Sequence, residues 1–198
     1  SNTEWVDNEI YDSQPLMTTC ELVPYAYCAG ADLSYMDLSG MDLTGIDLRG
    51  ANLQNTNFDY ATLDDADLRN IVAPNATFIH AGMNYTYLQN AELNKYSWDE
   101  CGGYCGAANL TDAVLRDADL TNANLNSVDL TDAILYNVDL TDANIFGANL
   151  TDAYLRDADL TNAILYNVDL TDADLRYADL TDADLRYAVL IDASLRDT

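Results

Sequence analysis

Apolar and polar positions alternate along this chain with a period of five residues. From Ala108 onward an apolar centre recurs every fifth position, from Leu110 to Leu195, and Ile145 is its only departure from leucine. A small residue, Ala or Val, stands two positions before each of these centres, from Ala108 to Ala193. A period of five matches neither the 3.6 residues of an α-helix nor the two of a β-strand. It predicts a coil with a corner every five residues, whose central and small residues point inward.

An earlier stretch of the chain follows the same pattern in another register. Its centres run from Leu33 to Trp98 and make 14 units, the last few imperfect, to which the second stretch adds 18. Pro74 stands directly after the weak centre Ala73. Because proline has no amide donor, this pair predicts a bulge or a local loop.

The repeated unit resembles that of a known family. Units such as Ala118-Asp119-Leu120-Thr121-Asn122 are similar to pentapeptide repeats, over about residues 31–98 and 108–195. The resemblance implies an all-β fold, a right-handed quadrilateral β-helix with four pentapeptides per coil. Thirty-two units then give about eight coils, and strand spacing gives a rod of about 38 Å. Each coil of such a solenoid is stabilised mainly by its nearest neighbours.

The repeats and the irregular segments divide the chain into four parts. We expect an N-terminal cap or arm at residues 1–30, a first repeat block at 31–98, a protruding Cys- and Gly-rich loop at 99–107, and a second block at 108–198. Both blocks share one pattern, which favours one continuous solenoid over two separate halves.

The two ends of the repeats differ in what could cover them. A solenoid needs its terminal apolar layers covered, and residues 1–30, with Trp5 and Tyr11, are the expected cap at one end. At the other end we expect Leu185, Leu190 and Leu195 to form an uncovered interface layer. Two such ends meeting would give a dimer, and docking on the Trp5 or Tyr11 region of another copy would give a head-to-tail filament. Fraying of a truncated end is the alternative.

Composition excludes several classes of protein. The 198 residues include 34 acidic and 8 basic side chains, for a net charge of −26, and 49% are hydrophobic. So much apolar material is enough for a core and untypical of a disordered chain. The acidity disfavours direct binding to nucleic-acid phosphates. No run of 18 apolar residues occurs, so no membrane-spanning helix is expected.

The four cysteines form two local pairs outside the regular repeats. Cys20 with Cys28 and Cys101 with Cys105 predict two disulfides that staple loops, and hence a protein that is secreted, periplasmic or in an organelle lumen. Zinc binding and free thiols are the alternatives. Asn75 and Asn84 begin Asn-x-Thr sequons in the irregular stretch and are candidate glycosylation sites.

Outward residues of the second block recur every twenty positions and therefore form columns. A column of aspartates invites two interpretations: carboxylates that accept hydrogen bonds from turn amides, or carboxylates that bridge Ca²⁺. The candidate ligands are Asp112, Asp132, Asp152 and Asp172. Neighbouring threonine rows suggest either ice binding or the ordinary preference of threonine for strands.

The sequence offers no catalytic machinery. His80 is the only histidine, no nucleophile is paired with a base, and no glycine-rich phosphate loop occurs, so we expect neither an enzyme nor a cofactor. Two functions remain. One is a structural or interaction solenoid outside the cytoplasm that associates with itself through its last coil. The other, implied by the family resemblance, is an acidic DNA mimic that binds a DNA-binding protein such as gyrase.

Overall fold

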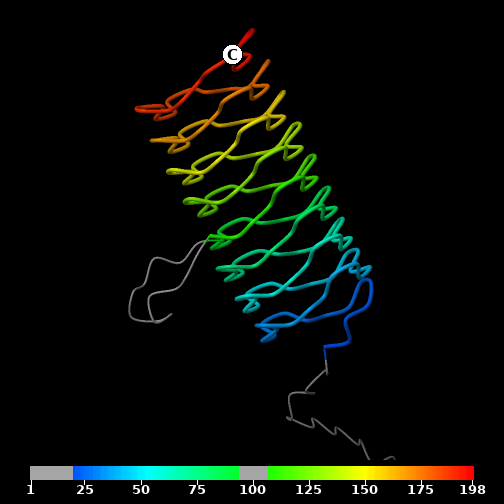
Figure 1. Ribbon diagram of the computed structural model, residues 1–198. Helices are drawn as coiled ribbons and strands as arrows, with labels where there is room; N and C mark the ends of the chain where they lie inside the picture. The colour runs from blue at the N-terminus through cyan, green and yellow to red at the C-terminus, as the bar shows by residue number, and fades with distance from the viewer. Residues whose placement is uncertain (1–19, 94–106) are drawn as a thin grey trace, which may run out of the picture.

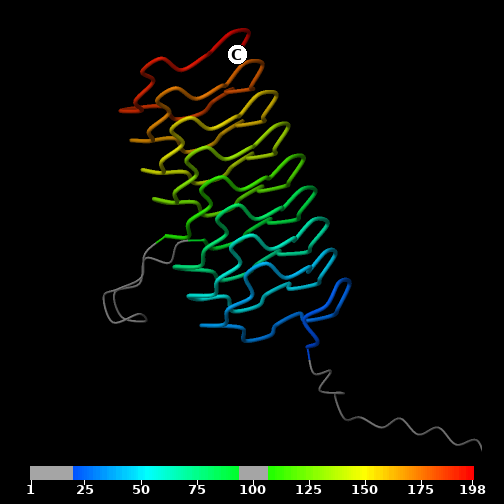
Figure 2. The same ribbon diagram turned by 45° about the vertical axis from the view of Figure 1, so that its right-hand side comes forward.

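The chain winds into a stack of four-sided coils. A computed structural model describes residues 20–93 and 107–198. Within each of these ranges every backbone bridge is parallel and joins residues 20 apart, as Asp129 pairs with Asn149, so four pentapeptides complete one coil. The coils stack along a single axis (Figures 1 and 2). The described ranges contain single-residue bridges separated by two-residue turns, with neither a helix nor a longer strand.

The coil has four faces, which we number in chain order. Each face is named by the apolar centre of its pentapeptide. The centres of face 1 are Leu38, Phe58, Phe78, Leu110, Leu130, Leu150, Leu170 and Leu190; of face 2, Leu43, Leu63, Met83, Leu115, Leu135, Leu155, Leu175 and Leu195; of face 3, Cys28, Leu48, Leu68, Leu88, Leu120, Leu140, Leu160 and Leu180; and of face 4, Leu33, Leu53, Ala73, Leu93, Leu125, Ile145, Leu165 and Leu185.

A two-residue turn follows each centre and makes the corner. The amide of Ala133 donates to the carbonyl of Leu130 at 3.0 Å, and this hydrogen bond closes the turn. The second turn residue, Asp132, has a φ of 57°. A positive φ at this place is the mark of a type II turn and favours Gly, Asn and Asp. The amide of Asp132 then donates to Thr151 of the next coil at 3.0 Å. The turns therefore contribute to the stacking as well as to the corners.

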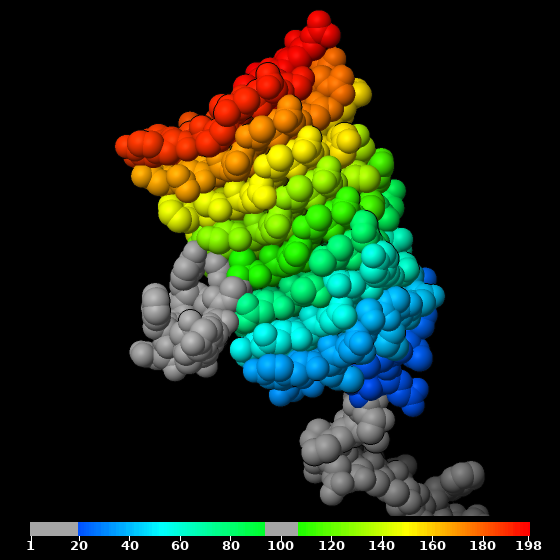
Figure 3. All heavy atoms as spheres, viewed as in Figure 1, coloured from blue at the N-terminus to red at the C-terminus, as the bar shows by residue number. Residues whose placement is uncertain are grey.

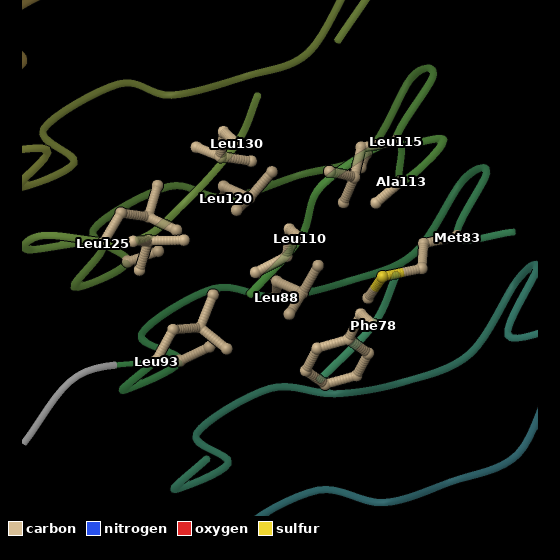
Figure 4. Packing of buried hydrophobic residues seen from close by; sticks show 14 of the residues in the cluster. Phe78, Met83, Leu88, Leu93, Leu110, Ala113, Leu115, Leu120, Leu125 and Leu130 are labelled. Carbon is tan, nitrogen blue, oxygen red and sulfur yellow. The ribbon is translucent and has the colours of Figure 1, made fainter. Parts of the chain in front are cut away.

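The interior of the rod is filled by one large and one small side chain per face. From Leu38 to Leu175 no centre is more than 2% exposed, and from Leu48 onward the residue two positions earlier, most often alanine or valine, is buried as well. Phe58 and Phe78 replace leucine on face 1, and their rings stack with centroids 5.0 Å apart. Figure 4 shows side chains from the four faces pointing into this common interior.

The second block continues the first in register. Thr77 pairs with Asn109, 32 residues later, so twelve extra residues separate coils that otherwise stack normally. The amide of Ala108 donates to the carbonyl of Leu93 at 2.9 Å, the bond that closes an ordinary two-residue turn elsewhere. Leu110 therefore occupies the place in the stack that the repeat pattern had given to Trp98, which lies outside the described residues.

The coil also begins earlier than the sequence pattern indicated. Tyr27 pairs with Asp47, and Cys28 is a buried centre of face 3, so the boundary at residue 30 was wrong for this segment. Cysteine was missed as a centre because it is small and stands where leucine is expected. Residues 1–19, with Trp5 and Tyr11, lie outside the described part. The handedness and the number of coils remain predictions.

The bulge expected at Pro74 is absent. Pro74 is the first residue of a turn, and its carbonyl accepts the amide of Asn55 at 3.0 Å as in the neighbouring coils. The amide at this turn position does not join the backbone ladder, so proline removes no ladder hydrogen bond. Ala73 is fully buried and leaves the stack unbroken.

Candidate functional site

The residue before each centre shapes the turn that follows. Asp129 shows the arrangement: its Oδ1 accepts the amide of Thr131 at 3.1 Å and the Thr131 hydroxyl at 2.6 Å. Asn149 makes the same pair of contacts with Thr151, at 3.1 and 2.7 Å. Short polar side chains that accept a hydrogen bond from two residues later stabilise turns in this way. The Asp/Asn-Leu-Thr pattern of the second block is therefore explained by local hydrogen bonding.

The same contacts bear on the ice-binding hypothesis. The hydroxyls of Thr111, Thr131, Thr151 and Thr171 each donate to the Asp or Asn side chain two residues earlier. Their hydrogens are directed to their own turns, and each threonine row is one residue wide. The rows lack the broad apolar-hydroxyl plane that ice binding would need.

The aspartate column considered for calcium has a different role. Asp112, Asp132, Asp152 and Asp172 are all second turn residues, with φ between 57° and 58°. Aspartate is one of the few residues that adopts this left-handed conformation readily. The turn amides of the second block are accepted instead by the Asp and Asn side chains that precede each centre, so the interpretation of this column as the acceptor of turn amides was wrong.

The calcium hypothesis finds no support in this geometry. Residues of the column repeat once per coil, in single file, so a cation between two coils would meet at most two carboxylates. Ca²⁺ takes six to eight oxygen ligands. In residues 20–93 and 107–198 no group of three or more His, Cys, Asp or Glu side chains is placed to hold a metal ion.

A second aspartate column, which sequence reasoning missed, runs along face 3. Asp119, Asp139, Asp159 and Asp179 pair with one another in successive bridges. On face 1 the equivalent column alternates Asp with Asn, and the Nδ2 of Asn149 donates to the Thr131 hydroxyl at 2.8 Å. Like charges that stack directly repel each other. The twenty-residue comparison in the sequence would have revealed this column, had it been applied to the position before the centre on this face as well as on face 1.

Lower on face 3 the aspartates are paired with arginines. Arg49 donates to Asp47 from Nε at 2.9 Å and from Nη2 at 2.6 Å, and Arg69 contacts Asp67 in the same way. The hydrogen bonds from Arg49 hold the pKa of Asp47 below its usual range. Arg176 does the same for Asp174 on face 2. These ion pairs hold the exposed arginine side chains in place and neutralise part of the negative charge of the surface.

Charge in the second block is concentrated on two opposite sides. Residues 108–198 hold 18 acids and 5 arginines, a net charge of −13. Seven of the acids lie on face 1 or its following corner and six on face 3 or its following corner, with no arginine on either. The other two corners carry the arginines and most of the aromatic side chains, among them the stacked Phe146 and Tyr166.

The predicted interface leucines lie in the last coil. Leu190 is 37% exposed and Leu195 40% exposed, whereas Leu185 is partly buried. Their amides occupy the position that donates to the next coil throughout the stack. Figure 3 shows this coil, in red, at one end of the elongated body. Val189 and Ile191 beside it are also exposed, where the lower coils of the second block have Asn or Asp and Thr on face 1.

The first cysteine pair forms a disulfide bond. A disulfide joins Cys20 to Cys28, and it ties the start of the described chain to the buried centre of the first coil. Cys101 and Cys105 lie outside the described residues.

The remaining candidates occupy ordinary places in the turns. Asn84 donates to Asp64 at 2.9 Å, and the Thr86 of its sequon is fully buried. Asn75 is a half-buried second turn residue with positive φ. The ring of His80 packs against Tyr60 with centroids 4.9 Å apart, and its Nδ1 lies 3.7 Å from Asp112.

Two solved structures of known proteins are similar to this chain. HetL, a pentapeptide repeat protein involved in heterocyst differentiation regulation from the cyanobacterium Nostoc sp. strain PCC 7120, is 26% identical over 85% of this chain and 86% of its own, with a TM-score of 0.41. QnrB1, a plasmid-mediated fluoroquinolone resistance protein, is 20% identical over 85% of this chain and 88% of its own, with a TM-score of 0.53. No curated protein matches the chain significantly.

None of the described residues form a helix long and apolar enough to cross a membrane. A profile for pentapeptide repeats (8 copies) matches residues 26–63, 56–94, 108–145, 139–176 and 163–198. These matches cover most of the chain and both blocks of stacked coils, and the chain therefore belongs to the pentapeptide-repeat family.

Proposed function

We propose that the protein is a non-enzymatic interaction rod that acts outside the cytoplasm and associates with itself through its last coil. The observation that carries the proposal is the exposure of the final leucine layer. Leu190 and Leu195 are 37% and 40% exposed, against at most 2% for every centre from Leu38 to Leu175. Exposed apolar layers with free strand amides favour pairing with another chain.

The disulfide supports the proposed location outside the cytoplasm. Disulfides persist in oxidising environments and are rare in the cytosol. Cys20 and Cys28 are joined in a segment that forms the first described coil. In this proposal the high negative charge keeps the rods soluble and limits contact between their sides.

Two geometries of self-association lead to different assemblies. Two last coils that meet face to face make a closed dimer. A last coil that docks on the N-terminal region of another copy, where Trp5 and Tyr11 are the candidate partner residues, makes an open filament. Light scattering after size exclusion, on unreduced protein over a wide concentration range, separates a mass that doubles and stops from one that keeps growing.

A matched pair of variants tests the end face. Leu190→Glu places a charge in the exposed layer, and we expect it to reduce the self-associated fraction by at least about tenfold. Tyr85→Glu also replaces an exposed apolar side chain, but far from the last coil, and should leave association unchanged. A monomeric wild-type protein at about 1 mM, or equal effects of both variants, would contradict the proposal.

The acid columns favour a second function, a DNA mimic that binds a DNA-binding protein such as gyrase. The −13 of residues 108–198 is spread over about 22 Å of rod, and duplex DNA carries about 13 charges in that length. The acids also gather on two opposite sides, as phosphates do along two strands. Competition with duplex DNA for gyrase, and protection of supercoiling against an inhibitor, test this function; no effect in either assay excludes it.

A further inference from the structure

One edge of the second block combines both charges in adjacent columns. This edge is the corner between faces 2 and 3, and we call it the mixed-charge edge. Four of the five arginines of residues 108–198 lie on it. Its first column is Arg116, Tyr136, Arg156, Arg176 and Arg196, and its second column is Asp117, Asn137, Asp157, Tyr177 and Asp197.

The side chains of this edge contact one another and remain accessible. Arg156 lies 3.2 Å from Asp157, and these side chains are 46% and 53% exposed. The Arg156 guanidinium also lies 5.2 Å from the centre of the Tyr177 ring, and that of Arg116 lies 4.7 Å from the Tyr136 ring. The contacts orient the groups and leave their outer surfaces open to a partner.

The edge differs from the rest of the second block in net charge. Its four arginines and three aspartates give +1, whereas residues 108–198 together carry −13. Two copies of so acidic a rod repel each other across any side that carries the acid columns. The repulsion is least where the local charge cancels. Arginine and tyrosine are also the residues most enriched at protein interfaces.

The two columns are complementary under one particular symmetry. A twofold axis parallel to the rod exchanges the columns and keeps the height, so the first column of one copy faces the second column of the other. Arg116, Arg156 and Arg196 then each face the aspartate that follows them in the second copy. At the remaining two levels Arg176 faces the ring of Tyr177, and Tyr136 faces Asn137.

Other arrangements lack this match. A twofold axis perpendicular to the rod leaves each column facing itself, arginine against arginine and aspartate against aspartate. At the corner between faces 1 and 2 the second block has Thr or Ile beside Asp and no cation. We propose that the mixed-charge edge is a lateral interface at which two copies of this chain pair side by side, with their rods parallel.

The pairing is independent of the end face. Ten side chains per copy make a small contact, at the lower end of specific interfaces, so we expect a dissociation constant of roughly 100 µM. Sedimentation equilibrium of the full unreduced chain measures it. Arg156→Asp leaves two facing pairs of acids at the central level of the dimer, and Asp157→Arg leaves two facing pairs of arginines there. Each alone should weaken pairing by at least about tenfold.

Exchange of the charges restores the match and gives the decisive test. The double variant Arg156→Asp with Asp157→Arg keeps opposite charges in facing columns, and its pairing should return to within about threefold of wild type. A mixture of the two single variants should form the mixed pair in preference to either pair of like copies. Melting temperatures of all variants confirm that the solenoid is folded, since arginine at the positive φ of Asp157 is strained.

Control variants separate the edge from the end face. Arg186→Asp changes the same turn position on the diagonally opposite corner and should not alter pairing. If Arg156→Asp and Arg186→Asp weaken pairing equally, or if the double variant fails to restore it, the lateral interface is wrong. If only Leu190→Glu dissociates the protein, the lateral interface is also wrong while the end-face proposal stands. If only the Arg156 and Asp157 variants dissociate the protein, the end-face proposal is wrong and the lateral interface stands.

Discussion

The unrelieved aspartate column of face 3 predicts a substitution that stabilises the protein. Asp139 lies between Asp119 and Asp159, one coil away on each side. At a coil spacing of about 4.8 Å, each neighbour contributes about 0.9 kcal/mol of repulsion in bulk water. Asp139 accepts the amide of Thr141 at 2.9 Å, a contact that asparagine also makes in this fold. Asp139→Asn should therefore remove repulsion and keep the turn.

Salt sets the size of the effect. Screening over the Debye length reduces the two repulsions to about 1.5 kcal/mol at 0.01 M salt, about 1 kcal/mol at 0.15 M and about 0.3 kcal/mol at 1 M. We expect Asp139→Asn to raise the free energy of unfolding by up to these amounts. Urea unfolding at the three salt concentrations measures it, with two spectroscopic probes because a stack of coils need not unfold in one step.

The matched control lies on face 1. Asn149 stands between Asp129 and Asp169, so Asn149→Asp creates the column that face 3 already has. It also removes the hydrogen bond that Asn149 donates to Thr131. This variant should destabilise the protein, most strongly at low salt. The reasoning is refuted if Asp139→Asn destabilises the protein at low salt, or if its effect does not change between 0.01 and 1 M.

Three further predictions follow from the turns and the ion pairs. Gly40 and Gly45 share a φ of +65°, but only a Cβ at Gly45 would meet the Tyr25 ring, at 2.4 Å. Gly40→Ala should lower the free energy of unfolding by roughly 1 kcal/mol, and Gly45→Ala should lower it by more, as thermal unfolding would measure. Replacement of residues 94–107 by Asn-Gly should leave a cooperative unfolding transition, because the flanking coils already stack across this segment; loss of folding would contradict that. Hydrogen bonds from arginines lower the pKa of carboxylates such as Asp47, so they stabilise the fold at a pH above the unfolded pKa of about 4. This contribution should disappear as the pH falls through the lower pKa of the folded state. Free energies of unfolding measured between about pH 6 and 2 would show the loss.

The sequence predicted the repeat unit because the periodicity is a local property. A centre every five residues, with a small residue two before it, allows no helix and no flat strand, and the centres from Leu110 to Leu175 are buried as expected. The different roles of the aspartates in the turns were harder to predict. Asp112 lies two positions after a centre and adopts a positive φ, whereas Asp129 lies one position before a centre and accepts a turn amide.

The ends of the described ranges and the insertion could not be predicted from local pattern. Trp98 has the spacing of a centre, but the place above Phe78 is taken by Leu110, since which residue fills it depends on where the chain returns to the stack. Cys28 does not look like a centre, and it is buried because the coil above it requires a partner there. Such positions are decided by contacts between coils.

The sequence by itself determined the five-residue unit, its inward and outward sides and the net charge of −26. Only the tertiary structure decided which units share a face, because the twelve-residue insertion breaks the simple count of twenty. It also placed the face 3 aspartates of the second block above Asp47, Asp67 and Tyr87 of the first block. The physical reason is that periodicity along the chain fixes the direction of each side chain, whereas its neighbours are set by the coils above and below.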